Sequence, residues 1–154
     1  SPLVVQKPER MIITAVEYHT TTWEMILPLD EDMILHVAPA SGGTPVPELT
    51  QAFLVPARTL VKINAAIWHL APLPATKQSL TAMIILPECT YANDCTVVNL
   101  EEDQYFDIIY ISGLYSRFVT RFFAKSNYYS KKKNPLVFFP TIFQIQNVYE
   151  YILN

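Results

Sequence analysis

The sequence has few of the residues on which catalytic and structural sites commonly depend. Its two cysteines, Cys89 and Cys95, match neither a disulfide framework nor a CxxC metal or redox pair in their spacing. We therefore expect a reducing, cytoplasmic setting. The three histidines are His19, His36 and His69, so any site built on imidazole must bring at least two of these residues together.

Basic residues are scarce in the first two thirds of the chain. Up to Gln104, five Lys/Arg stand against twelve Asp/Glu, a net charge of −7, whereas from Tyr105 onward six stand against two, a net charge of +4. Phosphate neutralisation needs clustered Lys and Arg, so the acidic part makes nucleic acid a poor partner and a small polar solute a better one. We place a boundary here, with one domain at residues 1–104 and a basic, aromatic-rich tail at 105–154.

Long apolar runs are also lacking. The segment Ser1–Pro8 has no apolar stretch of the kind found in a signal peptide, and the absence of an initiating methionine leaves open whether a portion precedes it. In the tail, Arg117, Arg121 and Lys125 interrupt the first apolar stretch, and prolines punctuate the second. We expect no transmembrane span, and we do not favour membrane contact by the tail.

Short β-type segments recur at intervals of about ten residues, with turn residues between them and almost no helical periodicity. This pattern is typical of a small antiparallel sandwich or barrel. We predict an all-β protein, a single barrel followed by an irregular or partly helical tail. The expected strands are residues 10–18, 25–29, 33–38, 52–55, 59–63, 67–69 and 81–86, with one helical turn at 48–51.

The tail allows two interpretations. Apolar residues at helical spacing and a basic line on another face predict an amphipathic helix that docks on the acidic barrel or lies on an anionic surface. Alternatively, a composition rich in Tyr, Phe, Ile, Asn and Lys is what translated A/T-rich non-coding sequence yields, so the tail need not be a native domain. The apolar positions are Ile108, Ile111, Tyr115, Phe118 and Phe122, and the basic line is Arg117, Arg121 and Lys125.

Glu17 and His19 are two residues apart on a predicted strand, so their side chains share one face. If that face is the barrel interior, a carboxylate and an imidazole lie side by side, as in metal and acid/base sites. The alternative is that both are solvated outside. His69 follows a tight bend and a tryptophan, and it is either a third member of such a site or a hydrogen-bonded core histidine.

The run from Glu17 to Glu24 resembles the first cupin motif, and Arg58 to His69 resembles the second. A more specific resemblance, over residues 9 to about 104, is to the ureidoglycolate lyase family of cupins. Four patches carry it in order: Glu17-Tyr18-His19; Ile26-Leu27-Pro28-Leu29; Ala52-Phe53-Leu54 with Val61 and Trp68-His69; and Asn93-Asp94-Cys95.

The resemblance implies a jelly-roll barrel that forms a homodimer. It also implies a carbon-nitrogen lyase of allantoin and purine nitrogen catabolism that cleaves ureidoglycolate to glyoxylate and urea. The expected ligand is a 2-hydroxy or 2-oxo acid, with no nucleotide cofactor and with one divalent ion such as Mn, Fe, Ni or Zn as an option. We assign catalysis to Glu17, His69 and His19, substrate binding to Lys62, Trp68 and His36, and metal binding to Glu17, His19, Glu24 and His69.

Three departures from the family pattern bear on activity. Leu70 stands where the family has a second histidine, and Cys89 stands where it has an arginine able to clamp a substrate carboxylate. Lys62 replaces an asparagine and compensates for that charge only if it faces inward. The alternative function is therefore a divergent cupin that binds a small organic acid or serves as a dimerisation module.

Overall fold

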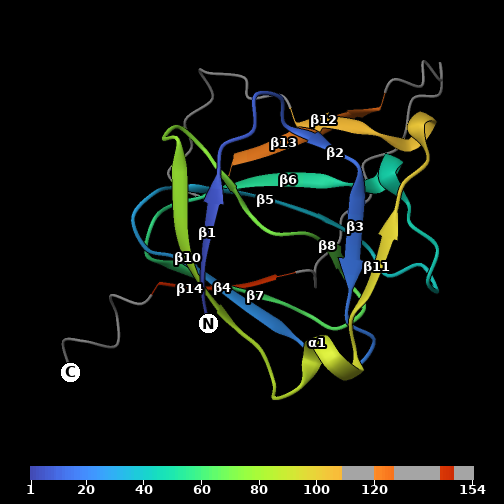
Figure 1. The fold of residues 1–154 in the computed structure, drawn as a ribbon, viewed down its shortest axis with the longest axis horizontal. Coiled ribbons are helices and arrows are strands. Elements are labelled where there is room, and N and C mark those ends of the chain that lie inside the picture. Colours follow the sequence, from blue (N-terminus) through green and yellow to red (C-terminus); the bar gives the residue numbers. More distant parts are fainter. Residues whose placement is uncertain (109–119, 127–142, 148–154) are drawn as a thin grey trace.

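The computed structural model describes residues 1–108, 120–126 and 143–147. These residues form antiparallel sheets with very little helix, which confirms the predicted all-β, cupin-like barrel (Figure 1). Within the described residues, no helix has the length and apolarity needed to cross a membrane. The elements are β1 (Pro2–Gln6), β2 (Ile12–Ile13), β3 (Ala15–Tyr18), β4 (Glu24–Pro28), β5 (Met33–Ala38), η1 (Pro47–Leu49), β6 (Gln51–Val55), β7 (Thr59–Ile63), β8 (Trp68–His69), β9 (Leu73–Pro74), β10 (Ser79–Ile85), α1 (Thr90–Asn93), β11 (Thr96–Asn99), η2 (Glu102–Gln104), β12 (Phe106–Ile108), β13 (Thr120–Ser126) and β14 (Phe143–Asn147).

Two sheets make up the barrel. One has the strand order β1-β10-β4-β7-β14, and the other runs β11-β3-β8-β5-β6-β13-β12-β2, with β9 paired to β5. Burial alternates along β4, β7 and β10, as expected for strands with one face on the core and one face outside. The walls of the barrel therefore have an inner and an outer face at each of these strands.

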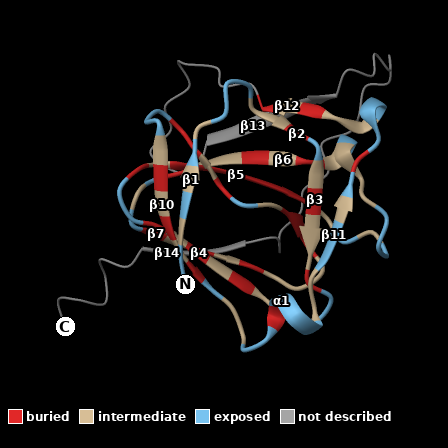
Figure 2. Ribbon diagram, viewed as in Figure 1, coloured by how far each residue is buried: buried red, intermediate tan, exposed pale blue. Residues whose placement is uncertain are grey.

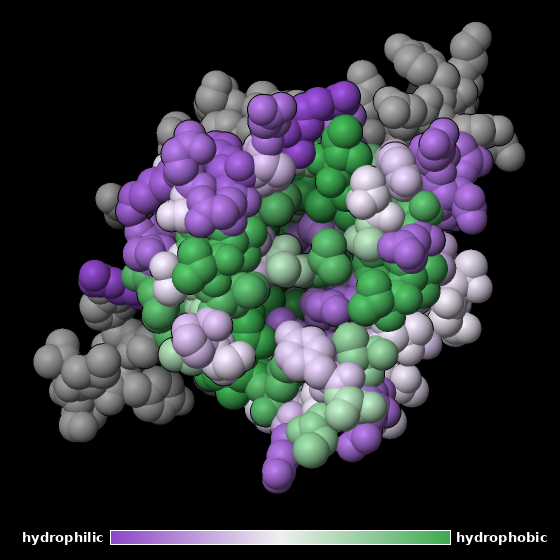
Figure 3. All heavy atoms as spheres, in the orientation of Figure 1, coloured by the Kyte–Doolittle hydropathy of each residue, from purple (hydrophilic) through white to green (hydrophobic). Residues whose placement is uncertain are grey.

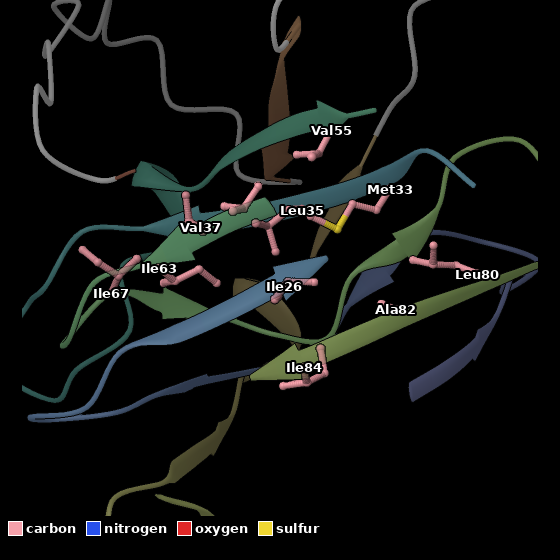
Figure 4. Packing of buried hydrophobic residues seen from close by; sticks show 11 residues of the cluster. Ile26, Met33, Leu35, Val37, Val55, Ile63, Ile67, Leu80, Ala82 and Ile84 are labelled. Atoms are coloured by element: carbon pink, nitrogen blue, oxygen red, sulfur yellow. The ribbon is translucent and has the colours of Figure 1, made fainter. Parts of the chain in front are cut away.

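The main core lies between the two sheets. Figure 4 shows Ile26 on β4 and Ile84 on β10 in one cluster with Leu35 and Val37 on β5. These side chains leave almost no surface exposed to water, and burying an aliphatic side chain of this size contributes about 1.5–3 kcal/mol. This packing holds the walls at the spacing on which the site depends. The buried members are Ile26, Met33, Leu35, Val37, Val55, Val61, Ile63, Ile67, Leu80, Ala82 and Ile84.

A second core covers the other face of β5. All six residues of β5 are buried, and Figure 2 shows the strand buried along its length. Because successive side chains point to opposite faces of a strand, both faces of β5 must be covered. Ile34 and Ala38 belong to a separate cluster with Ile13 and Phe106, which come from the paired strands β2 and β12. The long sheet thus folds back over its own central strand.

Apolar side chains also reach the surface. Figure 3 shows them gathered across the middle of the face viewed in Figure 1, with many hydrophilic side chains toward the periphery. Val4 on β1 and Ile85 on β10 are 60% and 40% exposed. Scattered exposed apolar residues are normal for a globular protein, so they identify no partner by themselves.

The predicted strands agree with the structure to different degrees. The strands at residues 33–38 and 59–63 are confirmed residue for residue, whereas the strand expected at 10–18 is divided at Thr14 into β2 and β3. The helix predicted over residues 108–125 is wrong where the structure describes the chain, since Ile108 ends β12 and residues 120–126 form β13. Burial of Phe106 and Ile108 on either side of Asp107 follows a period of two, as a strand requires. The rest of that predicted helix lies outside the described residues.

Candidate active site

Four acidic and imidazole side chains converge between the sheets. Glu17 lies on β3, His19 follows that strand directly, Glu24 begins β4 and His69 ends β8. Their potential ligand atoms all lie within 4.8 Å of one another. The register explains part of this geometry, because Glu17 is paired directly with His69, and side chains of paired residues lie on the same face of a sheet. The interior alternative for Glu17 and His19 is therefore the one that the fold adopts.

Both histidines are oriented by a backbone carbonyl. Nδ1–H of His19 donates to the carbonyl oxygen of Asp94 at 2.8 Å, and Nδ1–H of His69 donates to that of Ile67 at 2.8 Å. Because a carbonyl oxygen can only accept, Nδ1 carries the proton in both rings. Nε2 is thus the nitrogen that each ring presents to the cluster.

The two Nε2 atoms face the same carboxylate oxygen. Glu24 Oε2 lies 3.1 Å from His19 Nε2 and 3.4 Å from His69 Nε2. Burial by itself would raise the pKa of the Glu24 carboxyl, but the hydrogen bonds with the two histidines outweigh burial and lower it. Burial by itself would lower the pKa of His19, whereas the hydrogen bond with Glu24 raises it. These hydrogen bonds therefore favour the ionised form of the Glu24 carboxylate.

The group has the chemistry of a site for a divalent transition metal. Two imidazole nitrogens and one or two carboxylates are a donor set that Mn, Fe, Ni and Zn accept. A metal-binding histidine usually donates its second N–H to a carbonyl or carboxylate, as His19 and His69 both do. The side chains of His19, Glu24 and His69 are only 2–4% exposed, whereas that of Glu17 is 14% exposed. These residues fit a divalent ion, with Glu17 as the member open to a ligand.

Three residues of the segment from Tyr91 to Cys95, namely Tyr91, Asp94 and Cys95, contact this cluster. The Tyr91 ring lies edge-on to His19 at a centroid distance of 6.1 Å, and the Cys95 thiol donates to Glu17 Oε2 at 3.5 Å. Burial and the neighbouring Glu17 raise the pKa of Cys95 to about 11, so the sulfur remains a thiol at neutral pH. Sequence reasoning assigned no role to Tyr91 or Asp94. The resemblance at Asn93-Asp94-Cys95 was the available signal, but it did not say what these residues contact.

Two of the predicted substrate-binding residues, Trp68 and His36, lie on the other side of the barrel wall. Trp68 packs 4.4 Å from Tyr18 between ring centroids and donates from Nε1 to Ser41 Oγ at 2.8 Å. The ring of His36 lies edge-on to Phe106 at 5.7 Å. Neither ring nitrogen of His36 has a hydrogen-bond partner among the described residues. Both side chains face the second core, because β5 and β8 point alternate residues away from the cluster.

Lys62, the third predicted substrate-binding residue, lies on the outer face of β7. Its strand neighbours Val61 and Ile63 are buried, and its Nζ lies 5.8 Å from the centroid of the Trp23 ring. This geometry suits a cation–π contact at the surface. The inward orientation that a substrate role requires is not present, so the structure does not bring Lys62, Trp68 or His36 to the cluster.

The cupin-like antiparallel barrel encloses imidazole and carboxylate side chains between its sheets, an arrangement that suits acid/base or metal-assisted catalysis. The family model for ureidoglycolate lyase matches residues 4–107, a range that contains all four cluster residues. The chain belongs to the ureidoglycolate lyase family and is a lyase-like enzyme. A search of curated proteins gave no match.

Proposed function

We propose that the chain cleaves ureidoglycolate to glyoxylate and urea, with Glu17, His19, Glu24 and His69 as the reacting centre. The convergence of these side chains within 4.8 Å, in a chain of this family, is the observation that carries the proposal. The homodimer and the place in purine catabolism remain predictions from the family resemblance, and the cytoplasmic location remains a prediction from the cysteine pattern.

The reaction requires two proton transfers, one from an oxygen and one to a nitrogen, and both atoms are bonded to the same carbon. That carbon of ureidoglycolate bears a hydroxyl group, a ureido nitrogen and a carboxylate. A base removes the hydroxyl proton, the O–H electron pair becomes the carbonyl of glyoxylate, and the C–N bond breaks with its electron pair going to nitrogen. A proton returned to that nitrogen releases urea. A positioned acid or base contributes about 10²- to 10⁴-fold to such transfers.

Glu17 is the residue best placed to move this proton. It is the most exposed member of the cluster, so its carboxylate is the one that a substrate can reach. Its Oε1 also lies 3.9 Å from His69 Nε2, so the same carboxylate is close to an imidazole. A carboxylate that takes the hydroxyl proton can return the same proton to the urea nitrogen. Burial of the other three residues excludes water from the cluster and strengthens its electrostatic interactions.

His19, Glu24 and His69 would hold a divalent ion through their inward-facing atoms. When bound, the ion supplies positive charge that polarises the hydroxyl and carboxylate oxygens of the substrate. This charge matters here because Cys89 replaces the arginine of the family pattern and Lys62 faces outward. The chain's own contribution is to fix both Nε2 atoms on Glu24 through hydrogen bonds to backbone carbonyls.

A urea-release assay on purified protein, with elemental analysis of the same sample, tests the proposal. We expect Glu17→Gln and His69→Ala to lower kcat by about 100-fold or more, with metal content reduced in His69→Ala. Glu31→Gln is the matched control, because Glu31 is a buried carboxylate that binds the backbone at Thr76 and lies outside the cluster. Full activity in His69→Ala would remove that residue from the mechanism.

Leu70 and Cys89 favour a second candidate, a divergent cupin that binds a small organic acid without cleaving it. A ligand that binds only the folded state raises its stability by mass action. Glyoxylate should therefore raise the Tm under both proposals, whereas urea release occurs only under the first. A Tm unchanged by millimolar glyoxylate would leave the dimerisation module as the better interpretation.

A further inference from the structure

The carboxylate of Asp94 fastens the turn that follows β3. Its Oδ1 accepts the backbone N–H of Thr20 at 2.7 Å. Its Oδ2 accepts the backbone N–H and the hydroxyl of Thr21, both at 2.9 Å, and those of Thr22 at 2.8 and 2.9 Å. One side chain thus holds three consecutive residues. Hydrogen bonds from the turn, led by the Thr21 amide, keep the pKa of Asp94 well below its ordinary value, so the clamp remains ionised.

The main chain of the same residue holds His19. The Asp94 carbonyl accepts the Nδ1 proton of His19 at 2.8 Å, and the following strand β11 pairs with β3 through Thr96 and Tyr18. The clamped turn also leads directly into Glu24, the carboxylate that both imidazoles face. Asp94 therefore fixes the turn and the imidazole relative to each other, although it contributes no atom to the cluster.

We propose that Asp94 is the positioning residue of this site. Its side chain binds Thr20, Thr21 and Thr22, and this clamp keeps its main-chain carbonyl hydrogen-bonded to His19 Nδ1. Nε2 is then the nitrogen that His19 offers to the metal. This inference rests on the proposed function, because His19 Nε2 belongs to the proposed reacting centre. A group that orients a metal ligand by hydrogen-bonding to it, without binding the metal itself, commonly contributes about 10- to 100-fold to metal affinity. The expected loss in Asp94→Ala is of that size.

The experiment uses the full chain labelled with ¹⁵N at histidine, and Zn²⁺ as the probe. Long-range ¹H–¹⁵N spectra show which nitrogen of His19 carries the proton, and competition with a chelator gives the Zn²⁺ affinity. We expect Asp94→Ala to lose the protected Nδ1 proton of His19 and to bind Zn²⁺ about 10- to 100-fold more weakly. Asp94→Asn should recover part of both signals, because its amide oxygen still accepts a backbone N–H.

Asp30→Ala is the matched control, since Asp30 accepts the backbone N–H of Thr81 at 2.8 Å outside the cluster. It should leave the His19 spectrum and the Zn²⁺ affinity unchanged. Should Asp94→Ala fail to fold, the double variant Thr21→Val, Thr22→Val removes two hydroxyl donors while keeping the backbone amides, and we expect a several-fold loss of affinity.

Retention of the His19 Nδ1 proton and of full Zn²⁺ affinity in a folded Asp94→Ala would overturn the inference, as would an equal loss in Asp30→Ala. Absence of urea release by the unmodified chain would overturn the proposed function alone. The tautomer of His19 is read without substrate and without metal, so the two failures are distinguishable.

Discussion

Glu17 and His69 lie directly opposite each other on the paired strands β3 and β8, with Glu17 Oε1 3.9 Å from His69 Nε2. These residues are far apart in the sequence, and the ladder between the strands brings them together. Glu17 and His69 are therefore held by the backbone of the barrel wall and not by a flexible loop, which favours a fixed catalytic geometry. This rigidity makes the following outcomes predictable.

Zn²⁺ should stabilise the folded chain through the cluster. At a free concentration about 100 times Kd, an ion that binds only the folded state raises the free energy of unfolding by about 2.7 kcal/mol. Glu24→Gln should lose most of this gain, because both inward-facing imidazole nitrogens lie within 3.4 Å of the Glu24 carboxylate. Thermal unfolding with and without Zn²⁺ measures it, and Glu31→Gln should keep the gain. A Tm of the unmodified chain that no divalent transition metal changes would contradict this prediction.

Stability should fall in mild acid because of His36. Burial, and to a smaller extent the charge of His69, lowers the pKa of His36 from 6.5 to about 3. Between these values the unfolded chain binds a proton that the folded chain does not, so the free energy of unfolding decreases as the pH falls below about 6.5, by at most about 1.4 kcal/mol per pH unit. Urea unfolding near pH 7 and near pH 5 should show a smaller decrease in His36→Leu. Equal decreases in the two proteins would show that His36 does not carry the effect.

Phe106 should anchor β12 to the barrel. Its side chain is 1% exposed and lies against His36 in the second core. Phe106→Ala should lower the free energy of unfolding by about 3–5 kcal/mol, as for other buried aromatic residues. Val97→Ala, on an apolar residue that is 58% exposed, should change it by less than about 0.5 kcal/mol. A comparison of chains that end at Gln104 and at Ile108 would test the predicted domain boundary in the same assay.

The two cysteines should differ sharply in reactivity. Cys89 is exposed, whereas Cys95 is partly buried and hydrogen-bonded to Glu17, with its pKa raised to about 11. At about pH 8 only about one in a thousand Cys95 thiols is ionised, and the thiolate is the form that reacts. Mass spectrometry after brief iodoacetamide treatment should find Cys89 modified first. Faster labelling of Cys95 would contradict the placement of its sulfur beside a carboxylate.

Much of the site could be predicted from local sequence because it depends on strand parity. Glu17 and His19 share a face wherever their strand lies, and the resemblance to cupin motifs added Glu24 and His69. Parity alone does not identify the inner face. The orientation of Lys62 was left open for this reason, and the structure places it on the outer face of β7. The assignment of His36 to substrate binding failed because His36 lies on a strand that is buried on both faces.

Long-range contacts account for what the sequence could not reveal. The clamp between Asp94 and Thr20, Thr21 and Thr22 joins segments with no local pattern in common. The helix predicted at Ile108 and at residues 120–126 was wrong for a related reason. Helical spacing of the tail's apolar residues suggested an amphipathic helix, whereas the pairing of β12 with β2 and β13 imposes a strand.

Because both faces of β5 are buried, no position on that strand can be substituted without an effect on core packing. A substitution at any of its six residues changes the side-chain volume in one of the two cores. Substitutions at two adjacent residues change the packing of both cores. Among natural variants, β5 should therefore be where tolerated substitutions are rarest and where they come with compensating changes on β4 and β10 or on β2 and β12.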